Sequence, residues 1–131
     1  MATHIKGNIQ KNHYKTTLTN GRHELVADEP TDIGGTDLGF RPSELLSSAL
    51  ATCTCVTLRM YADRKAWALE DVQVSIDFEW DNATKTTHIK RHITLVGDLS
   101  DDEKTRLMDI ADKCPTHKIL SNPIVIASVL D

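Results

Sequence analysis

The chain lacks the features that mark several large classes of protein. Its 15 Lys and Arg residues are outnumbered by 19 Asp and Glu, so it has no basic excess of the kind that binds nucleic acid or an acidic membrane surface. Its uninterrupted apolar runs are shorter than the roughly 18 residues of a membrane span, and its first residues, MATHIKGNIQ, lack the apolar core of a signal peptide. We therefore expect a cytoplasmic protein with no nucleic-acid or membrane partner.

Cysteine is also scarce. The three cysteines form no CxxC pair and the six histidines are scattered, so the spacing of a zinc site is missing and we expect no bound metal. An odd number of cysteines in a reducing compartment favours free, reactive or transient thiols over structural disulfides.

The 131 residues suffice for one domain with its own core, and we expect a single domain over residues 1–131. Near its start, Asn20-Gly21 lies between the strand-like runs HYKTTLT and HELVADE, which is a strong hairpin signal and predicts a meander. The segment DEPTDIGGTDLGFRP then concentrates glycine and proline and predicts a loop that leads into a helix.

The predicted helix that follows, ELLSSALATCTCVTLRM, carries no charge from Leu45 to Leu58. Its apolar residues recur at helical intervals, so a wide face is expected to pack in the core. The central stripe comprises Leu46, Leu50, Cys53, Thr57 and Met60, with Leu45, Ala49, Thr52 and Val56 beside it. Cys55 lies about 200° around the helix from Cys53, so both thiols cannot face one site, and Cys55 is interpreted as packing.

Beyond the helix the apolar period changes to two. The residues that alternate with polar neighbours, and so predict a strand buried on one face, are Val72, Val74, Ile76, Phe78 and Trp80. THIKRHITLVG is the expected antiparallel return, and its alternation places Arg91 on the same face as Ile89 and Ile93.

Two further helices and a strand complete the predicted order. Ser100 and Glu103 have the capping-box spacing that starts a helix. Pro115 cannot continue that helix cleanly, so CPTHKIL is expected to begin a short third helix, and NPIVIASVL to close the chain as a strand.

Cys114 is the N-cap of the third helix in this arrangement. Its sulfur is then expected to lie near unpaired amides and the positive end of the helix dipole, which lowers a thiol pKa and favours the nucleophilic thiolate. The alternative is structural, because an isolated cysteine on an apolar helix is usually a small hydrophobe. His117, one turn on, either tunes or protonates a thiol or is a surface histidine.

Four segments carry a resemblance to a known family. They are DEP at 28–30 with Gly34-Gly35, PSELLSSALATC at 42–53 followed by TLRMYADRKAW, Arg91 with Gly97 and Leu99, and ADKCPTHKIL at 111–120. In this order they resemble the OsmC/Ohr family of osmotically inducible and organic-hydroperoxide-resistance proteins, over nearly the whole chain. The resemblance implies an α+β fold of antiparallel sheets packed with two long helices, assembled as an intertwined homodimer with sites near the subunit interface.

The resemblance also implies a chemistry. In the peroxidase members one cysteine attacks the peroxide and becomes a sulfenic acid, a second resolves it as a disulfide, and an external thiol reduces the disulfide. Cys53 matches the first cysteine and Cys114 the second, with a small organic hydroperoxide as substrate, a dithiol as reductant and no bound cofactor. A neighbouring thiol also protects a sulfenic acid from over-oxidation. Because burial raises a thiol pKa, a cation must compensate, and the family supplies an arginine held by a glutamate.

The chain departs from the hydroperoxide-resistance pattern at that arginine and glutamate. Ser43 stands where those members carry a glutamate, and Glu44 follows one place later. Glu44 lies about 180° around the helix from Cys53 and about 13 Å along it, so it either serves a site across a dimer interface or only stabilises the helix N-terminus. Arg41 is the candidate replacement for the family arginine, or an exposed charge. These departures point to the YhfA-like branch of the family.

We therefore expect a thiol-dependent redox protein that reduces organic hydroperoxides, with Cys53 as nucleophile and Cys114 as resolving thiol. Arg41 and Glu44 are the further candidate site residues. The alternative function is a non-enzymatic small-ligand-binding or redox-sensing dimer with the same fold, because family membership does not fix function. A purely structural pair of cysteines would be inert and would bind no ligand.

Overall fold

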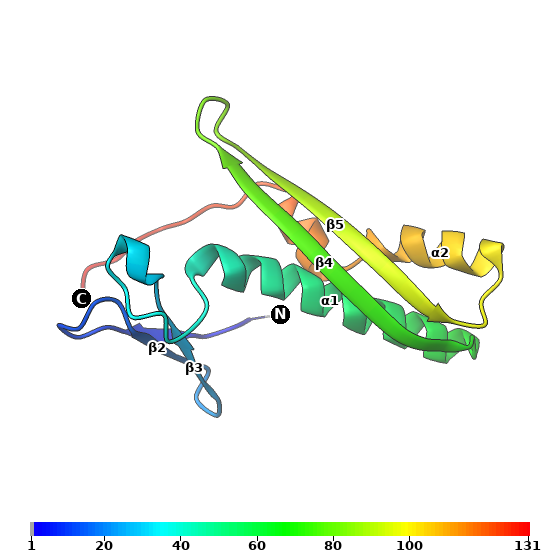
Figure 1. The fold of residues 1–131 in the computed structure, drawn as a ribbon, viewed down its shortest axis with the longest axis horizontal. Coiled ribbons are helices and arrows are strands. Elements are labelled where there is room, and N and C mark those ends of the chain that lie inside the picture. Colours follow the sequence, from blue (N-terminus) through cyan, green and yellow to red (C-terminus); the bar gives the residue numbers. More distant parts are fainter. Residues whose placement is uncertain (1) are drawn as a thin grey trace. The chain divides into compact units, whose positions relative to one another are not determined.

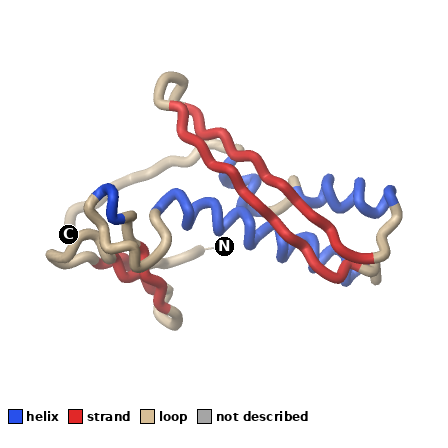
Figure 2. Tube along the Cα trace, in the orientation of Figure 1, coloured by secondary structure: helices blue, strands red, loops and turns tan. Residues whose placement is uncertain are grey.

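The computed structural model describes residues 2–131, and its sheets and helices are shown in Figures 1 and 2. Both sheets are antiparallel and are accompanied by helices, so the predicted α+β class is confirmed. The chain divides into two compact units, Met1–Leu46 and Ser47–Asp131. That the whole chain acts as a single domain stays a prediction.

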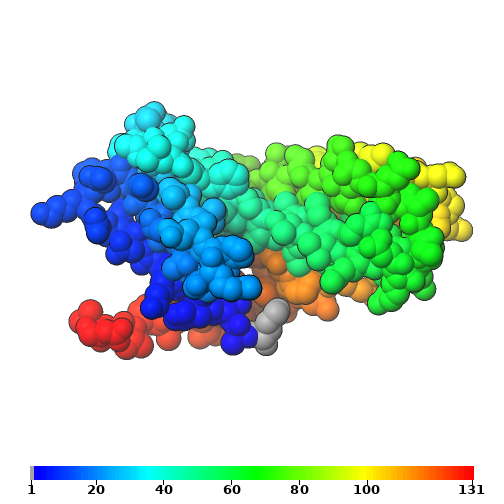
Figure 3. Space-filling view, turned by 90° about the horizontal axis from the view of Figure 1, so that it is seen from below, coloured from blue at the N-terminus to red at the C-terminus, as the bar shows by residue number. Residues whose placement is uncertain are grey.

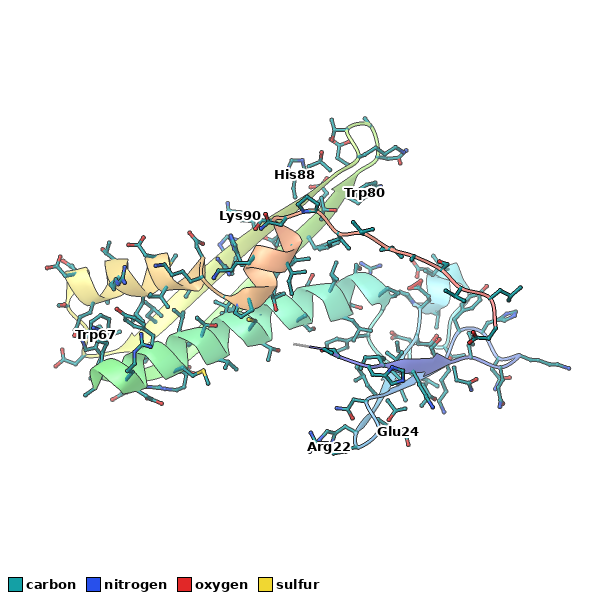
Figure 4. The ribbon with its side chains drawn as sticks, turned by 180° about the vertical axis from the view of Figure 1, so that it is seen from behind. Arg22, Glu24, Trp67, Trp80, His88 and Lys90 are labelled. Carbon is teal, nitrogen blue, oxygen red and sulfur yellow. The ribbon has the colours of Figure 1, made fainter. Side chains whose placement is uncertain are left out.

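The first unit contains the predicted meander. Its strands pair antiparallel in the order β1 (Lys6–Asn8), β2 (Thr16–Thr19) and β3 (Glu24–Ala27). The predicted turn joins β2 to β3: Gly21 has a φ of 94°, and the Asn20 side-chain oxygen accepts hydrogen bonds from the main-chain N–H groups of Arg22 and His23 at 2.9 and 2.8 Å. Arg22 and Glu24 are labelled at this turn in Figure 4.

The loop predicted after β3 is confirmed and is organised by Asp28. This carboxylate is buried and accepts hydrogen bonds from the Thr36 hydroxyl at 2.5 Å and from the main-chain N–H groups of Tyr14, Glu29 and Leu38 at 3.1, 2.7 and 3.2 Å. The bond from Thr36 has the largest effect, and together these donors outweigh burial and hold the pKa of Asp28 well below its usual range. One charged side chain thus fixes the whole loop.

α1 (Pro42–Lys65) is the long helix predicted from the uncharged stretch, with proline in its first turn as expected. Its buried stripe differs from the prediction and comprises Leu50, Thr54, Leu58, Tyr61 and Ala62. Of the predicted stripe, Cys53 is only half-buried and Met60 is 67% exposed, because the buried face is centred on Thr54 and Leu58. By length and composition α1 is also apolar enough to cross a membrane, a test that core helices of soluble proteins pass too.

β4 (Leu69–Asp81) and β5 (Thr86–Gly97) form a long antiparallel hairpin that crosses α1 obliquely (Figure 1). The predicted alternation is confirmed from Val72 to Phe78, where every second side chain is partly buried. Trp80 does not follow it: the residue lies towards the turn of the hairpin and is 52% exposed (Figure 4). The register pairs Arg91 with Ile76 and turns both to the partly buried face.

α2 (Asp101–Ala111) and α3 (Pro115–Leu120) follow as predicted. Ser100 and Glu103 form the predicted capping box, in which each side chain accepts a hydrogen bond from the other's main-chain N–H, at 3.1 and 2.9 Å. The core cluster of this unit consists of Leu58, Tyr61, Ala62, Leu69, Leu107, Ile110 and Ala111. Trp67 lies between the ends of α1 and α2 (Figure 4), and the space-filling view shows α1, β4 and α2 closely packed (Figure 3).

The prediction that NPIVIASVL forms a last strand is wrong for the single chain. Residues 123–131 form no strand, and Val125, Ile126, Val129 and Leu130 are each at least 83% exposed. A strand needs a neighbouring edge to pair its N–H and C=O groups. Within residues 2–131 neither sheet pairs with this segment, although its sequence alternates as a strand requires.

Candidate functional site

Cys53 and Cys114 interact directly. Cys53 is half-buried on α1, and Cys114 is fully buried directly before α3. The two thiols lie close enough for each to shift the pKa of the other. Both are free thiols. The fold thus brings together the two cysteines that the sequence predicts as a redox pair.

The two thiol pKa values move in opposite directions. Burial raises the pKa of Cys53, but hydrogen bonds from the Cys114 thiol, the Thr116 hydroxyl and amide, and the Thr57 hydroxyl outweigh it, so this pKa lies below its ordinary value. Burial raises the pKa of Cys114, and so does its hydrogen bond to Cys53. Cys53 is therefore the thiol of the pair that ionises first. Hydrogen-bond donors supply the stabilisation that we expected from a cation.

Cys114 is the N-cap of α3, as predicted from the position of Pro115. The main-chain N–H of His117 donates to the Cys114 sulfur at 3.4 Å. Burial and the interaction with Cys53 raise the pKa of Cys114, and they outweigh the lowering by the His117 amide that this position predicts. The expected net lowering of the Cys114 pKa is therefore wrong.

Cys55 faces away from the pair, as helical geometry predicts. Its thiol donates to the main-chain oxygen of Val72 on β4 at 3.8 Å. Burial raises the pKa of Cys55, and the nearby charge of Asp71 adds to this effect. A protonated, hydrogen-bonded thiol of this kind is a packing residue and not a nucleophile.

Arg91 is the charged residue that the sequence interpretation left out of the site. Its side chain is 11% exposed. Nη1 donates to the Thr54 hydroxyl at 3.0 Å and to the Ala111 carbonyl at 3.4 Å. Nη2 donates to Asp112 Oδ1 at 3.0 Å and lies 3.4 Å from Nδ1 of His117. The signal in the sequence was a charge at a position where strand alternation turns the side chain inward.

A cavity of about 330 Å³ opens beside Arg91 and His117. Its walls are formed by Leu50, Thr87, Ile89, Arg91, His117, Leu120 and Ser121. Mixed walls of this kind suit a small molecule with apolar and polar parts. Within the described range 2–131, no group of three His, Cys, Asp or Glu side chains is placed to hold a metal ion.

Arg41 and Glu44 pair with each other in the first unit. Their side chains are about half exposed, with Arg41 Nε 3.8 Å from Glu44 Oε1. The same Glu44 oxygen accepts a hydrogen bond from the Arg41 main-chain N–H at 3.1 Å, directly before Pro42 begins α1. Glu44 therefore stabilises the helix N-terminus, one of its two predicted roles. A part for either residue in catalysis stays a prediction.

The part of the chain that matches a known family contains both Cys53 and Cys114. A family model for the OsmC-like proteins matches residues 35–129. The chain belongs to the OsmC family. Membership of this family supports a redox or peroxide-related role. Membership of the YhfA-like branch stays a prediction. A comparison with curated proteins finds no match.

Solved structures share the fold of this OsmC-family chain at low sequence identity. An OsmC-like protein from Mycoplasma pneumoniae is 19% identical, with a TM-score of 0.79 over 92% of this chain and 87% of the other. An organic hydroperoxide resistance protein OsmC from Legionella pneumophila is 21% identical, with a TM-score of 0.69 over 92% and 90%. The organic hydroperoxide resistance protein OhrB of Bacillus subtilis is 17% identical, with a TM-score of 0.63 over 92% and 91%. These likenesses confirm the predicted OsmC/Ohr fold.

Proposed function

We propose that this protein reduces small organic hydroperoxides, with Cys53 as the nucleophile, Cys114 as the resolving thiol and an external dithiol as the reductant. The observation that carries the proposal is the closeness of Cys53 and Cys114, whose interaction lowers the pKa of Cys53 and raises that of Cys114. Attack requires a thiolate, and resolution requires a second thiol beside it.

The proposed reaction has three steps. The Cys53 thiolate attacks the terminal peroxide oxygen, the O–O bond breaks, and the alkoxide leaves and takes a proton to become the alcohol. Cys114 then attacks the Cys53 sulfenic acid, which forms the disulfide and releases water. A dithiol reduces that disulfide and is itself oxidised, so two electrons pass from the dithiol to the peroxide.

Steady-state reduction of tert-butyl hydroperoxide with dithiothreitol tests the proposal. Wild type turns over, Cys53→Ser is inactive, and the Cys55→Ser control keeps its rate because Cys55 faces β4. Cys114→Ser consumes peroxide at Cys53 but forms no intramolecular disulfide. The absence of turnover in fully reduced wild type, or undiminished turnover in Cys53→Ser, contradicts the proposal.

The alternative is a non-enzymatic dimer that binds a small ligand or senses oxidants. The cavity of about 330 Å³ beside Arg91 and His117 favours it, because its walls are partly apolar and partly polar. Mass spectrometry after mild peroxide treatment separates a redox pair from ligand binding alone, and the turnover assay with dithiothreitol separates a peroxidase from an oxidant sensor. Rapid loss of two hydrogens that joins Cys53 to Cys114 supports a redox pair, whereas thiols that stay unmodified support ligand binding.

A homodimer is part of the proposal. The chain exposes apolar side chains on α1, with Val56 48% and Met60 67% exposed, and along residues 124–130 at its end. Exposed apolar surface of this extent marks an interaction site, and a second copy of the chain is the partner that the family predicts. In such a dimer Arg41 and Glu44 remain the candidates for a contribution to the thiol site of the other subunit.

A further inference from the structure

Arg91 contacts the turn of α1 that carries Cys53. The Thr54 hydroxyl, one residue on, donates to the Leu50 carbonyl at 2.7 Å and accepts from Arg91 Nη1 at 3.0 Å. A hydroxyl has one proton, so the bond to Leu50 leaves its oxygen free to accept. Because Thr54 is 0% exposed, loss of the arginine would leave a buried acceptor without that donor.

The same guanidinium contacts the segment on both sides of Cys114. Nη1 donates to the Ala111 carbonyl, and Nη2 donates to Asp112, both of which precede Cys114. The ring of His117 lies 3.4 Å from Nη2, and the amide of the same residue donates to the Cys114 sulfur. A planar guanidinium fixes several partners at once because its donors form a rigid fork.

We propose that Arg91 is a positioning residue that holds the α2–α3 junction against α1, so that Cys114 stays in reach of Cys53. The inference rests on the proposed redox function and adds the residue that makes disulfide closure fast. Protein groups engage both terminal nitrogens of Arg91, so the role proposed here is to hold these segments together, apart from the cavity wall that Arg91 also forms. If Arg91 has this positioning role, removing its guanidinium slows the step that joins Cys53 to Cys114.

A two-step thiol exchange measures this closure without peroxide. In a Cys55→Ser background, the Cys53 thiolate attacks 4,4′-dithiodipyridine, which forms a mixed disulfide and releases one thiopyridone. Cys114 then loses its proton to solvent and attacks the Cys53 sulfur, which releases a second thiopyridone and closes the disulfide. The two releases, followed by absorbance, separate attack at Cys53 from closure by Cys114.

We expect Arg91→Met to slow the second release about tenfold or more, since it removes hydrogen bonds from a charged donor. Arg91→Lys keeps the charge but loses the fork, so its closure rate is intermediate. Thr54→Val removes one acceptor of Arg91, and adding it to Arg91→Met slows closure no further, because both changes break the same contact.

Arg59→Met is the matched control. Arg59 also donates from a guanidinium, to Asp63 and to the Leu69 carbonyl, but neither of these residues flanks either thiol. Normal closure in Arg91→Met, or equal slowing in Arg59→Met, overturns the inference. If Arg91→Met does not fold, Arg91→Lys and Thr54→Val decide the question in the same assay. A protein that closes fast yet fails to reduce hydroperoxide contradicts the proposed function alone.

Discussion

Cys114 lies close enough to Cys53 to lower its pKa, and the main-chain N–H of His117 donates to the sulfur of Cys114 at 3.4 Å. The pKa of Cys53 is lowered and that of Cys114 is raised, so Cys53 is the sulfur on which negative charge is better tolerated. The resolving thiol thus has two tasks. It stabilises the thiolate before attack, and it closes the disulfide afterwards.

Replacing Cys114 changes the ionisation of Cys53. Cys114→Ala removes the donor, so the pKa of Cys53 rises, the thiolate fraction near pH 7 falls, and alkylation by iodoacetamide slows there. Cys114→Ser keeps a donating hydroxyl and shifts the pKa less. The measurement is the alkylation rate of Cys53 against pH in a Cys55→Ser background, for which wild-type Cys114 gives a midpoint below the usual thiol value of about 8.5. An unchanged midpoint in Cys114→Ala contradicts this account.

The Asp28 loop is predicted to weaken in acid. Hydrogen bonds depress the folded-state pKa of Asp28, so its stabilising contribution is present above the unfolded pKa of about 3.9 and is lost as pH falls through the folded value. Asp28→Asn removes the charge at all pH values, and the amides of Tyr14, Glu29 and Leu38, which donate to Asp28, then exchange hydrogen faster.

Asp32→Asn is the control for that experiment, because Asp32 lies in the same loop but is exposed. Its amide exchange should match wild type at these three positions. Equal protection in Asp28→Asn and wild type at pH 7 would show that the carboxylate does not hold the loop.

The capping box of α2 makes a separate, local contribution to stability. Ser100→Ala removes the acceptor of the Glu103 N–H and is expected to lower the free energy of unfolding by about 1 kcal/mol, whereas Ser100→Asp keeps an acceptor and stays near wild type. Urea unfolding followed by circular dichroism measures the difference. Equal midpoints for Ser100→Ala and wild type would mean that this helix start adds nothing to stability.

Elements set by local chemistry were predictable from the sequence. The Asn20-Gly21 turn, the Ser100 cap and the start of α3 after Cys114 each depend on a few adjacent residues. The partners of Arg91 were not predictable, because Thr54, Asp112 and His117 come from separate segments that only tertiary packing brings to one guanidinium.

The buried face of α1 illustrates the same limit. Helical periodicity shows which residues share a face, but what covers that face depends on the rest of the fold, and here the buried stripe passes through Thr54 and leaves Met60 exposed. The terminal segment 123–131 has the alternation of a strand, yet a strand forms only where an edge is available to pair with it. Both departures leave apolar side chains uncovered in the single chain.

Those uncovered side chains give the last prediction. If Met60 lies in a homodimer interface, Met60→Glu places a charge in an apolar contact and shifts the protein towards monomer, as measured by sedimentation velocity over a range of concentrations. Met108→Glu is the control, since Met108 is 45% exposed but lies on α2 among the charged residues of DDEKTRLMD. Dimers that persist in Met60→Glu at concentrations where wild type begins to dissociate would exclude this face of α1 from the interface.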